Sequence, residues 1–125
     1  MILRGGANIY PAEVEAALSA HPDVRSCVVV GLPDEELGQR VHAILELVES
    51  GDIQAVADGM RDFLADRLSR YKHPESFETV AVGLRDDSGK VRRTWLRDER
   101  AAWLSENRAF RIFPARRRGN AVYEK

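Results

Sequence analysis

The sequence has 125 residues, 44% of them hydrophobic and 31% charged, a composition that indicates one soluble globular domain with a modest core. Its formal net charge of -1 does not favour a nucleic-acid-binding protein, and no apolar stretch approaches the ~20 residues of a membrane span. The single cysteine, Cys27, excludes an internal disulfide and favours a reducing compartment, so the cytoplasm is the expected location.

The first segment, "MILRGGANIYP", predicts a tight reversal between two short extended elements. Gly5 and Gly6 accept the positive φ that such a turn requires. Pro11 keeps Tyr10 extended and suits the first position of a helix. The helix predicted from Pro11 has one apolar face, formed by Val14, Ala17, Leu18 and His21.

Two strands are expected next. "VRSCVVVGLPDEELG" predicts a buried strand around Cys27–Val30, central in the sheet, that ends at Gly31 and the turn-forming Pro33–Asp34. We interpret Cys27 as a buried structural thiol. "RVHAILELVE" predicts a strand with one buried face and one mixed face. We expect His42, on the mixed face, to be partly exposed rather than catalytic.

The second half continues the alternation of helix and strand. Residues 52–68 have helical apolar spacing for four turns, and Pro74 keeps "YKHPESFETVAV" extended. The loop "GLRDDSGK" then precedes a last helix from about Val91. The order β-α-β-β-α-β-α predicts an α+β domain over residues 1–105, with a small mixed sheet flanked by helices and an N-terminal hairpin. Residues 106–125 lack periodicity and form a basic extension, either disordered or docked elsewhere.

Three segments occur together in this chain: "RGGANIYPAEVEAAL", "VVVGLPDEELGQRV" and "DDSGKVRRTWLR". In this order and approximate spacing they resemble the C-terminal domain of adenylate-forming (AMP-binding) enzymes, in the acyl-CoA synthetase branch. The resemblance covers roughly residues 2–97. It implies a mobile domain of an AMP-forming acid:CoA ligase, whose large N-terminal domain binds the acid and ATP with its Mg²⁺. The family's hinge residue precedes the segment that begins at Ile2. We therefore expect that Met1 was placed at the hinge of a longer protein and is not the native start of a separate subunit.

The resemblance also assigns Lys90 the role of the catalytic lysine, because that lysine lies in a "GK" turn in the family. In the first half-reaction a carboxylate attacks the α-phosphate of ATP, and a compact ammonium bridging the two anions lowers the barrier. Gly89 permits the tight turn. Asp86 and Asp87 depart from the family's usual residues and could pair with Lys90.

In the second half-reaction CoA attacks the acyl-adenylate, after the domain has rotated. Gly5, Gly6 and Ala7 match the family hairpin that then faces the active site and leaves room for the pantetheine arm. The resemblance implies that the CoA nucleotide lies near the "GLPDEELG" loop and the "YKHP" segment. In the "YKHP" region the resemblance allows Tyr71 to stack on adenine and Lys72, His73 or Arg70 to contact phosphates. The alternative is an ordinary basic entrance to a strand.

Other interpretations stay open. The chain has no phosphate-cradling glycine loop of the GxxxxGKS type, so we expect it to be inactive alone. It could be a natural subunit that acts in trans, or a non-catalytic module that binds protein or RNA through its sheet and the basic run Arg116–Arg118. Lys90 could also be a regulatory acetylation site. The match of Arg92 and Arg93 to the family's basic pair predicts that they anchor the last helix or interdomain contacts.

Overall fold

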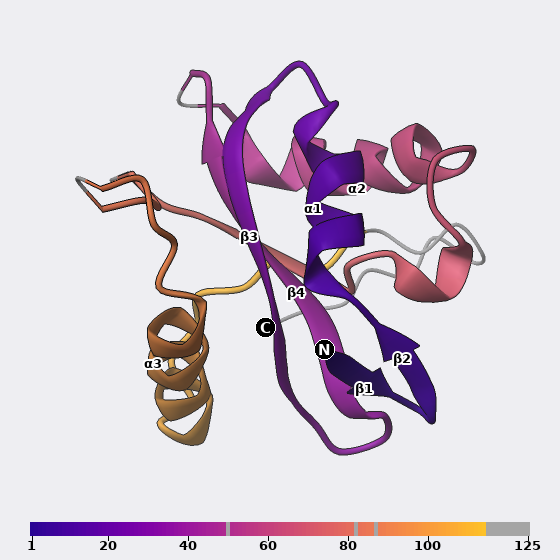
Figure 1. Cartoon of the computed structure of the whole chain (residues 1–125), viewed down its shortest axis with the longest axis vertical. Helices are drawn as coiled ribbons and strands as arrows, with labels where there is room; N and C mark the ends of the chain where they lie inside the picture. Colours follow the sequence, from indigo (N-terminus) through magenta and orange to yellow (C-terminus); the bar gives the residue numbers. More distant parts are fainter. Residues whose placement is uncertain (50, 82, 87, 115–125) are drawn as a thin grey trace.

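The computed structural model describes residues 1–49, 51–81, 83–86 and 88–114. These residues form an α+β domain in which helices cover both faces of a mixed sheet, as the sequence predicts (Figure 1). In chain order the elements are β1 (Ile2–Arg4), β2 (Ala7–Ile9), α1 (Pro11–Ser19), β3 (Val24–Asp34), β4 (Gly38–Leu47), α2 (Ile53–Leu64), the 3₁₀ helix η1 (Arg70–Lys72), β5 (Ser76–Thr79) and α3 (Arg93–Ser105).

Strand β4 is the centre of the sheet. It pairs antiparallel with β3 over its whole length, from Val24 opposite Leu47 to Asp34 opposite Gly38. Its other side pairs antiparallel with β1 near Gly38 and parallel with β5 from His42 onward. The parallel pair makes the sheet mixed. The central position predicted for the strand around Cys27–Val30 is wrong, because β3 lies at one edge and β4 is central.

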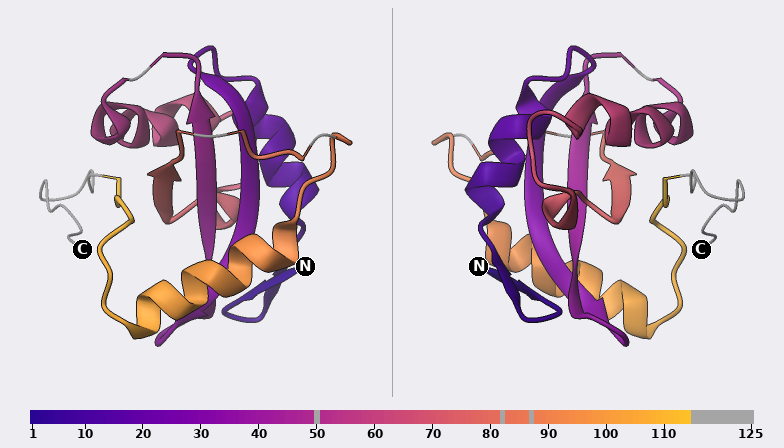
Figure 2. Two further views of the ribbon diagram at one scale, coloured as in Figure 1. Left: turned by 90° about the vertical axis from the view of Figure 1, so that its left-hand side faces the viewer. Right: turned by 90° about the vertical axis from the view of Figure 1, so that its right-hand side faces the viewer.

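The sheet lies between two helical layers, α1 and α2 on one face and α3 on the other (Figure 2). On the first face, Val29 and Ala43 pack with residues of α1 and α2 such as Leu18 and Met60. On the second face, Val28 and Ile44 pack with Leu96 of α3. Since both faces are covered, β3 needs apolar residues at consecutive positions, and this explains the unbroken run after Cys27.

The strand predicted around Cys27–Val30 does not end at Gly31, although the turn predicted at Pro33–Asp34 does follow it. Strand β3 runs through Gly31 and Pro33 to Asp34, and the reversal follows because Asp34 Oδ1 accepts the amide hydrogens of Glu36 and Leu37, both at 2.9 Å. A Cβ at Gly31 would lie 3.1 Å from the Ile2 side chain, so this glycine gives room to β1 rather than ending the strand. An edge strand also tolerates proline.

The expected partial exposure of His42 is also wrong. The mixed face of β4 is covered by α3, and the His42 side chain is fully buried beneath that helix. The helix predicted over residues 52–68 is shorter than expected as well. Helix α2 begins after Asp52, whose side chain accepts the Gln54 amide hydrogen, and ends at Leu64, although Leu68 is still buried.

The extension assigned to residues 106–125 is described as far as Pro114. After α3 the chain turns at Asn107, and Phe77 of β5 then exchanges two backbone hydrogen bonds with Ile112, of 2.8 and 2.7 Å. This part of the extension therefore lies along β5. The basic run Arg116–Arg118 lies outside the described residues. No helix in the described part of the chain is long and apolar enough to cross a membrane.

Candidate functional site

Lys90 lies in a tight hairpin between β5 and α3. Arg85 and Val91 form an antiparallel bridge at its base, and the Asp86 amide donates to the Lys90 carbonyl at 2.9 Å. Gly89 closes the turn with φ of 82°, a backbone conformation that residues other than glycine rarely adopt. The sequence therefore holds Lys90 at a fixed place in the turn, directly ahead of α3.

Asp86 shapes this hairpin from inside. Its Oδ1 accepts hydrogen bonds from the Ser88 hydroxyl at 2.6 Å, the Ser88 amide at 2.9 Å and the Lys90 amide at 2.9 Å. The Ser88 hydroxyl and the Lys90 amide lower the pKa of Asp86. The sequence allowed Asp86 to pair with the Lys90 ammonium, but Asp86 bonds Ser88 and the Lys90 backbone amide instead. Aspartate two residues before serine is a known turn signal that could have indicated this role. Asp87 lies outside the described residues.

The Lys90 side chain is exposed. Its ammonium makes no hydrogen bond or ion pair with any residue that the structure describes. In the left view of Figure 2, the segment that carries it projects sideways past the sheet edge formed by β3. Lys90 can thus offer its full charge to a ligand outside the domain.

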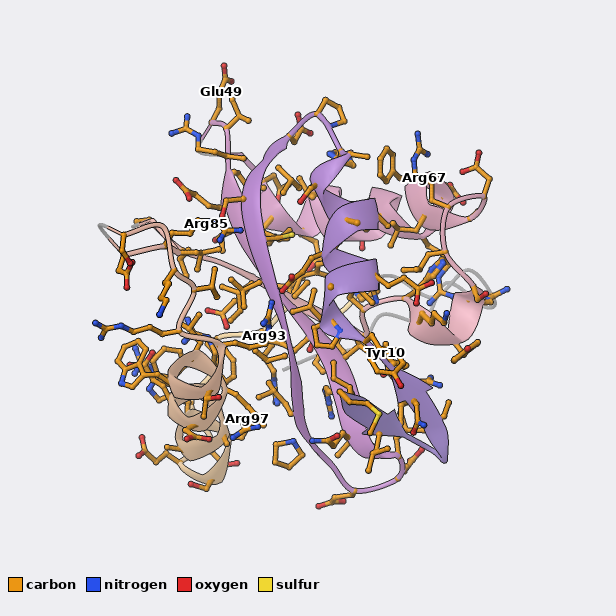
Figure 3. All side chains as sticks on the ribbon, viewed as in Figure 1. Tyr10, Glu49, Arg67, Arg85, Arg93 and Arg97 are labelled. Atoms are coloured by element: carbon orange, nitrogen blue, oxygen red, sulfur yellow. The ribbon has the colours of Figure 1, made fainter. Side chains whose placement is uncertain are left out.

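The start of α3 is tied to the opposite helical layer. Arg93 donates from Nη2 to Glu15 Oε2 of α1 at 2.6 Å, and the same oxygen accepts the Val29 amide of the edge strand at 2.9 Å (Figure 3). The expectation that Arg93 anchors the last helix is confirmed. Arg92 is exposed beside it.

The N-terminal hairpin has the backbone that its glycines predict. Gly5 and Gly6 have φ of 56° and 89°, and a Cβ at Gly6 would meet nothing within 4 Å. The Gly5 amide donates to the Leu37 carbonyl at 2.8 Å, so the hairpin is bonded to the turn between β3 and β4. Ala7 pairs with Arg4 and is partly buried. The hairpin presents a nearly bare backbone to solvent at its tip.

Tyr71 and Lys72 lie on the surface of η1, next to the start of α1. The Tyr71 side chain is 43% exposed. Lys72 Nζ bonds both carboxylate oxygens of Glu13, at 2.9 and 3.0 Å, and this hydrogen-bonded pairing raises the pKa of Lys72. Because Glu13 follows β2 closely in the chain, the structure brings these two residues near the N-terminal hairpin.

His73 has a different environment from its neighbours. Its side chain is buried, and Nε2 donates to the Leu68 carbonyl at 3.0 Å. Burial lowers the pKa of His73. It therefore faces the interior beneath η1 and not the surface on which Tyr71 and Lys72 lie.

The candidate residues form two surfaces rather than one site. In Figure 1 the Lys90 hairpin lies at one side of the domain, and η1 with the β1–β2 end of the sheet lies at the opposite side. In the described ranges, no three His, Cys, Asp or Glu side chains are placed to hold a metal ion. The sequence reasoning did not single out Glu78 and Arg100, which are buried with His42 under α3. The alternation of Ser76, Phe77 and Glu78 along β5 was the available signal.

Comparison with known proteins shows the family to which the chain belongs. The family model described as the AMP-binding enzyme C-terminal domain matches residues 13–90. Fatty acid–acyl-carrier-protein ligase ScoC from Streptomyces coeruleorubidus is 41% identical over 97 residues, which are 78% of this chain and 18% of ScoC. The 2-succinylbenzoate–CoA ligase of Bacillus velezensis is 41% identical over 105 residues, or 84% of this chain and 21% of that enzyme.

Solved structures agree with the curated relatives. A Mycobacterium tuberculosis fatty acyl CoA synthetase superposes with a TM-score of 0.70 at 35% identity, covering 82% of this chain and 20% of that one. An acyl-CoA synthetase from Brucella canis gives a TM-score of 0.74 at 30% identity, covering 86% and 19%. The chain thus spans about a fifth of the length of the proteins that it matches.

Proposed function

The chain belongs to the family of AMP-binding enzyme C-terminal domains, and we propose that it is the mobile domain of an ATP-dependent acid:CoA ligase. The observation that carries the proposal is the exposed Lys90 ammonium, held on a projecting glycine hairpin without a partner among the described residues. The large domain that binds the acid, ATP and Mg²⁺ is part of the proposal, and so is the cytoplasmic location that the single cysteine favours.

Lys90 acts in the first half-reaction. A carboxylate oxygen of the acid bonds to the α-phosphorus of ATP, the bond to the bridging oxygen breaks, and pyrophosphate leaves. Two anions must approach each other, and their repulsion is part of the barrier. The Lys90 ammonium lies between the carboxylate and the α-phosphate when the domain closes, and it stabilises the charge that they share. The ordered hairpin keeps the cost of this placement low.

The second surface serves the second half-reaction. The hairpin around Gly5, Gly6 and Ala7 leaves room for a pantetheine arm, while Tyr71 stacks on the adenine of CoA and Lys72 meets its phosphates. To bind a phosphate, the Lys72 ammonium must either leave the Glu13 carboxylate or keep that ion pair and contact the phosphate at the same time. His73 supports η1 from below. The positions of Lys90 and this surface at opposite sides of the domain support a rotation of the domain between the two half-reactions as part of the proposal.

The identity of the acceptor thiol is a finer part of the proposal. ScoC is described as a ligase that uses acyl carrier protein, whereas the Bacillus velezensis relative is described as a CoA ligase. Both acceptors present a pantetheine thiol, so the glycine hairpin suits either of them. We favour CoA because Tyr71 and Lys72 offer an aromatic face and a cation to a nucleotide.

A domain exchange tests the proposal. The C-terminal domain of the Bacillus velezensis ligase is replaced by this chain, and adenylation is followed by ATP–pyrophosphate exchange. We expect exchange and thioester formation by the assembled ligase, and neither reaction by the 125-residue chain alone. Robust exchange by the isolated chain would contradict the proposal, as would an assembled ligase that folds but is no more active than the large domain by itself.

A further inference from the structure

A polar cluster is buried between α3 and the sheet. It consists of His42 on β4, Glu78 on β5 and Arg100 on α3, with exposed fractions of 0%, 5% and 3%. These residues come from three elements that are far apart in the sequence. None of them has a role in the proposed chemistry.

The hydrogen bonds of the cluster are directional. Arg100 donates from Nε to Glu78 Oε1 and from Nη2 to Glu78 Oε2, the latter at 2.9 Å. His42 Nε2 lies 2.8 Å from Glu78 Oε1, and His42 Nδ1 lies 2.7 Å from the Ser76 hydroxyl. The Glu78 carboxylate therefore accepts two hydrogen bonds from Arg100 and is also hydrogen-bonded to His42. An arginine fork fixes the angle as well as the distance of its partner.

The charge state follows from these contacts. Burial alone would raise the pKa of Glu78, but the hydrogen bonds from His42 and Arg100 lower it overall. Burial lowers the pKa of His42, the Arg100 and Arg111 charges act in the same direction, and Glu78 opposes them. A neutral His42 donates from Nε2 to the Glu78 carboxylate and accepts the Ser76 hydroxyl at Nδ1. Every ring nitrogen and carboxylate oxygen in the cluster then has a partner.

Helix α3 depends on this cluster for its placement. Leu96 and Arg100 are the buried residues of α3. The fully buried contact between this helix and the sheet is therefore made by one apolar side chain and one arginine. Apolar contacts are not directional, whereas the Arg100 fork is. Val91, which directly follows Lys90, packs against the same core as Leu96. A shift of α3 would therefore shift the Lys90 hairpin.

We propose that His42, Glu78 and Arg100 are positioning residues for Lys90, which set the place and angle of α3 and hence the point that the Lys90 ammonium reaches on closure. This inference rests on the proposed function. A buried ion pair contributes little net stability, and its replacement by apolar residues of similar volume is often tolerated. The cluster thus contributes geometry more than stability.

Hydrogen exchange on the 125-residue chain tests the placement without catalysis. Two variants remove the cluster: Arg100→Met alone, and the apolar triple variant His42→Leu, Glu78→Met and Arg100→Met. We expect amide exchange over residues 85–96 to become at least tenfold faster in both, with the unfolding midpoint of the triple variant near that of the parent chain. Arg100→Lys keeps the charge without the fork and should give intermediate exchange. Arg97→Met is the matched control, since Arg97 lies on α3 and pairs only with the adjacent Asp98 among the described residues.

The assembled ligase then tests the consequence for activity. The triple variant should lower the rate constant of adenylation at least tenfold with little change in KM for ATP, and Arg97→Met should leave both unchanged. The inference is overturned if the folded triple variant keeps parental exchange over residues 85–96, or if it keeps parental adenylation while Lys90→Ala abolishes that reaction. If Lys90→Ala has no effect, the proposed function itself fails.

Discussion

Glu15 and Arg93 join the two helical layers of the domain, because Arg93 Nη2 lies 2.6 Å from Glu15 Oε2. The same oxygen accepts the Val29 amide of the edge strand at 2.9 Å. One carboxylate thus fixes α1, β3 and the start of α3 together, three residues beyond Lys90. The Lys90 hairpin is held at this end by Glu15 and farther along α3 by Glu78.

Removal of the two partners should have unequal effects. Arg93 is 42% exposed, so Arg93→Met should lower the free energy of unfolding by about 0.5–1 kcal/mol, the range of a solvent-screened ion pair. Glu15→Ala should cost about 1–3 kcal/mol, because the Val29 amide also loses its acceptor. Urea unfolding of the two variants measures the difference. Equal losses would show that the bond to Val29 contributes nothing.

Two glycines form a matched test of the Lys90 turn. Neither Gly89 nor Gly59 has an atom within 4 Å of an added Cβ, but only Gly89 has positive φ. Gly89→Ala should therefore destabilise the hairpin by about 1–2 kcal/mol, whereas Gly59→Ala should stabilise α2 by about 0.5–1 kcal/mol. Chemical denaturation gives both signs, and adenylation by the assembled ligase should fall for Gly89→Ala alone. Two effects of the same sign would refute this account of the turn.

Stability should decrease as the pH falls below about 6.5. Burial lowers the pKa values of His42 and His73 from the ordinary 6.5. Below this pH the two histidines are therefore protonated in the unfolded chain while they stay neutral in the folded chain. The free energy of unfolding therefore rises with pH in this window, by up to about 1.4 kcal/mol per pH unit for each histidine. Glu78, whose pKa is lowered from 4.5, adds a loss in the same direction at lower pH.

Urea titrations between pH 5 and 7.5 measure this slope. His42→Gln and His73→Gln should each flatten it, and the double variant should flatten it most. A parental slope in the double variant would mean that neither histidine stays neutral on folding.

Lys72 should matter for the thiol substrate and not for adenylation. Lys72→Met in the assembled ligase should raise KM for CoA about tenfold, the equivalent of roughly 1.4 kcal/mol, with ATP–pyrophosphate exchange unchanged. Steady-state kinetics of each half-reaction measure this separation. Glu13→Gln is the matched control, because it frees Lys72 from its partner and should not raise KM for CoA. A loss of ATP–pyrophosphate exchange in Lys72→Met would contradict this prediction, because it would mean that Lys72 takes part in adenylation.

Local patterns predicted most of the fold. Gly5 and Gly6 permit the positive φ of a tight turn, and Pro11 and Pro74 restrict the backbone, so the hairpin, the first helix and the extended segment before β5 could be placed from the sequence. Lys90 was identified as a candidate from its "GK" turn and from the resemblance of three segments of the sequence to a family. Each of these signals lies within a few residues of the feature that it predicts.

The errors all depend on contacts between distant residues. His42 is buried because α3, which begins about fifty residues later, covers its face of the sheet. Gly31 continues a strand because Ile2 packs against it. Glu78 and Arg100 attract attention only after folding brings them together. Periodicity along one segment carries no information about which other segment will cover it.

The separation of the half-reactions in a Lys90→Ala ligase tests the central claim most directly. ATP–pyrophosphate exchange should fall by ~10²–10³, the usual cost of one preorganised cation at a developing charge. Thioester formation from supplied acyl-adenylate should stay within about twofold of the parent, because the proposed rotation removes Lys90 from the site before this step. An equal loss in both half-reactions, or no loss in either, would contradict the role proposed for Lys90.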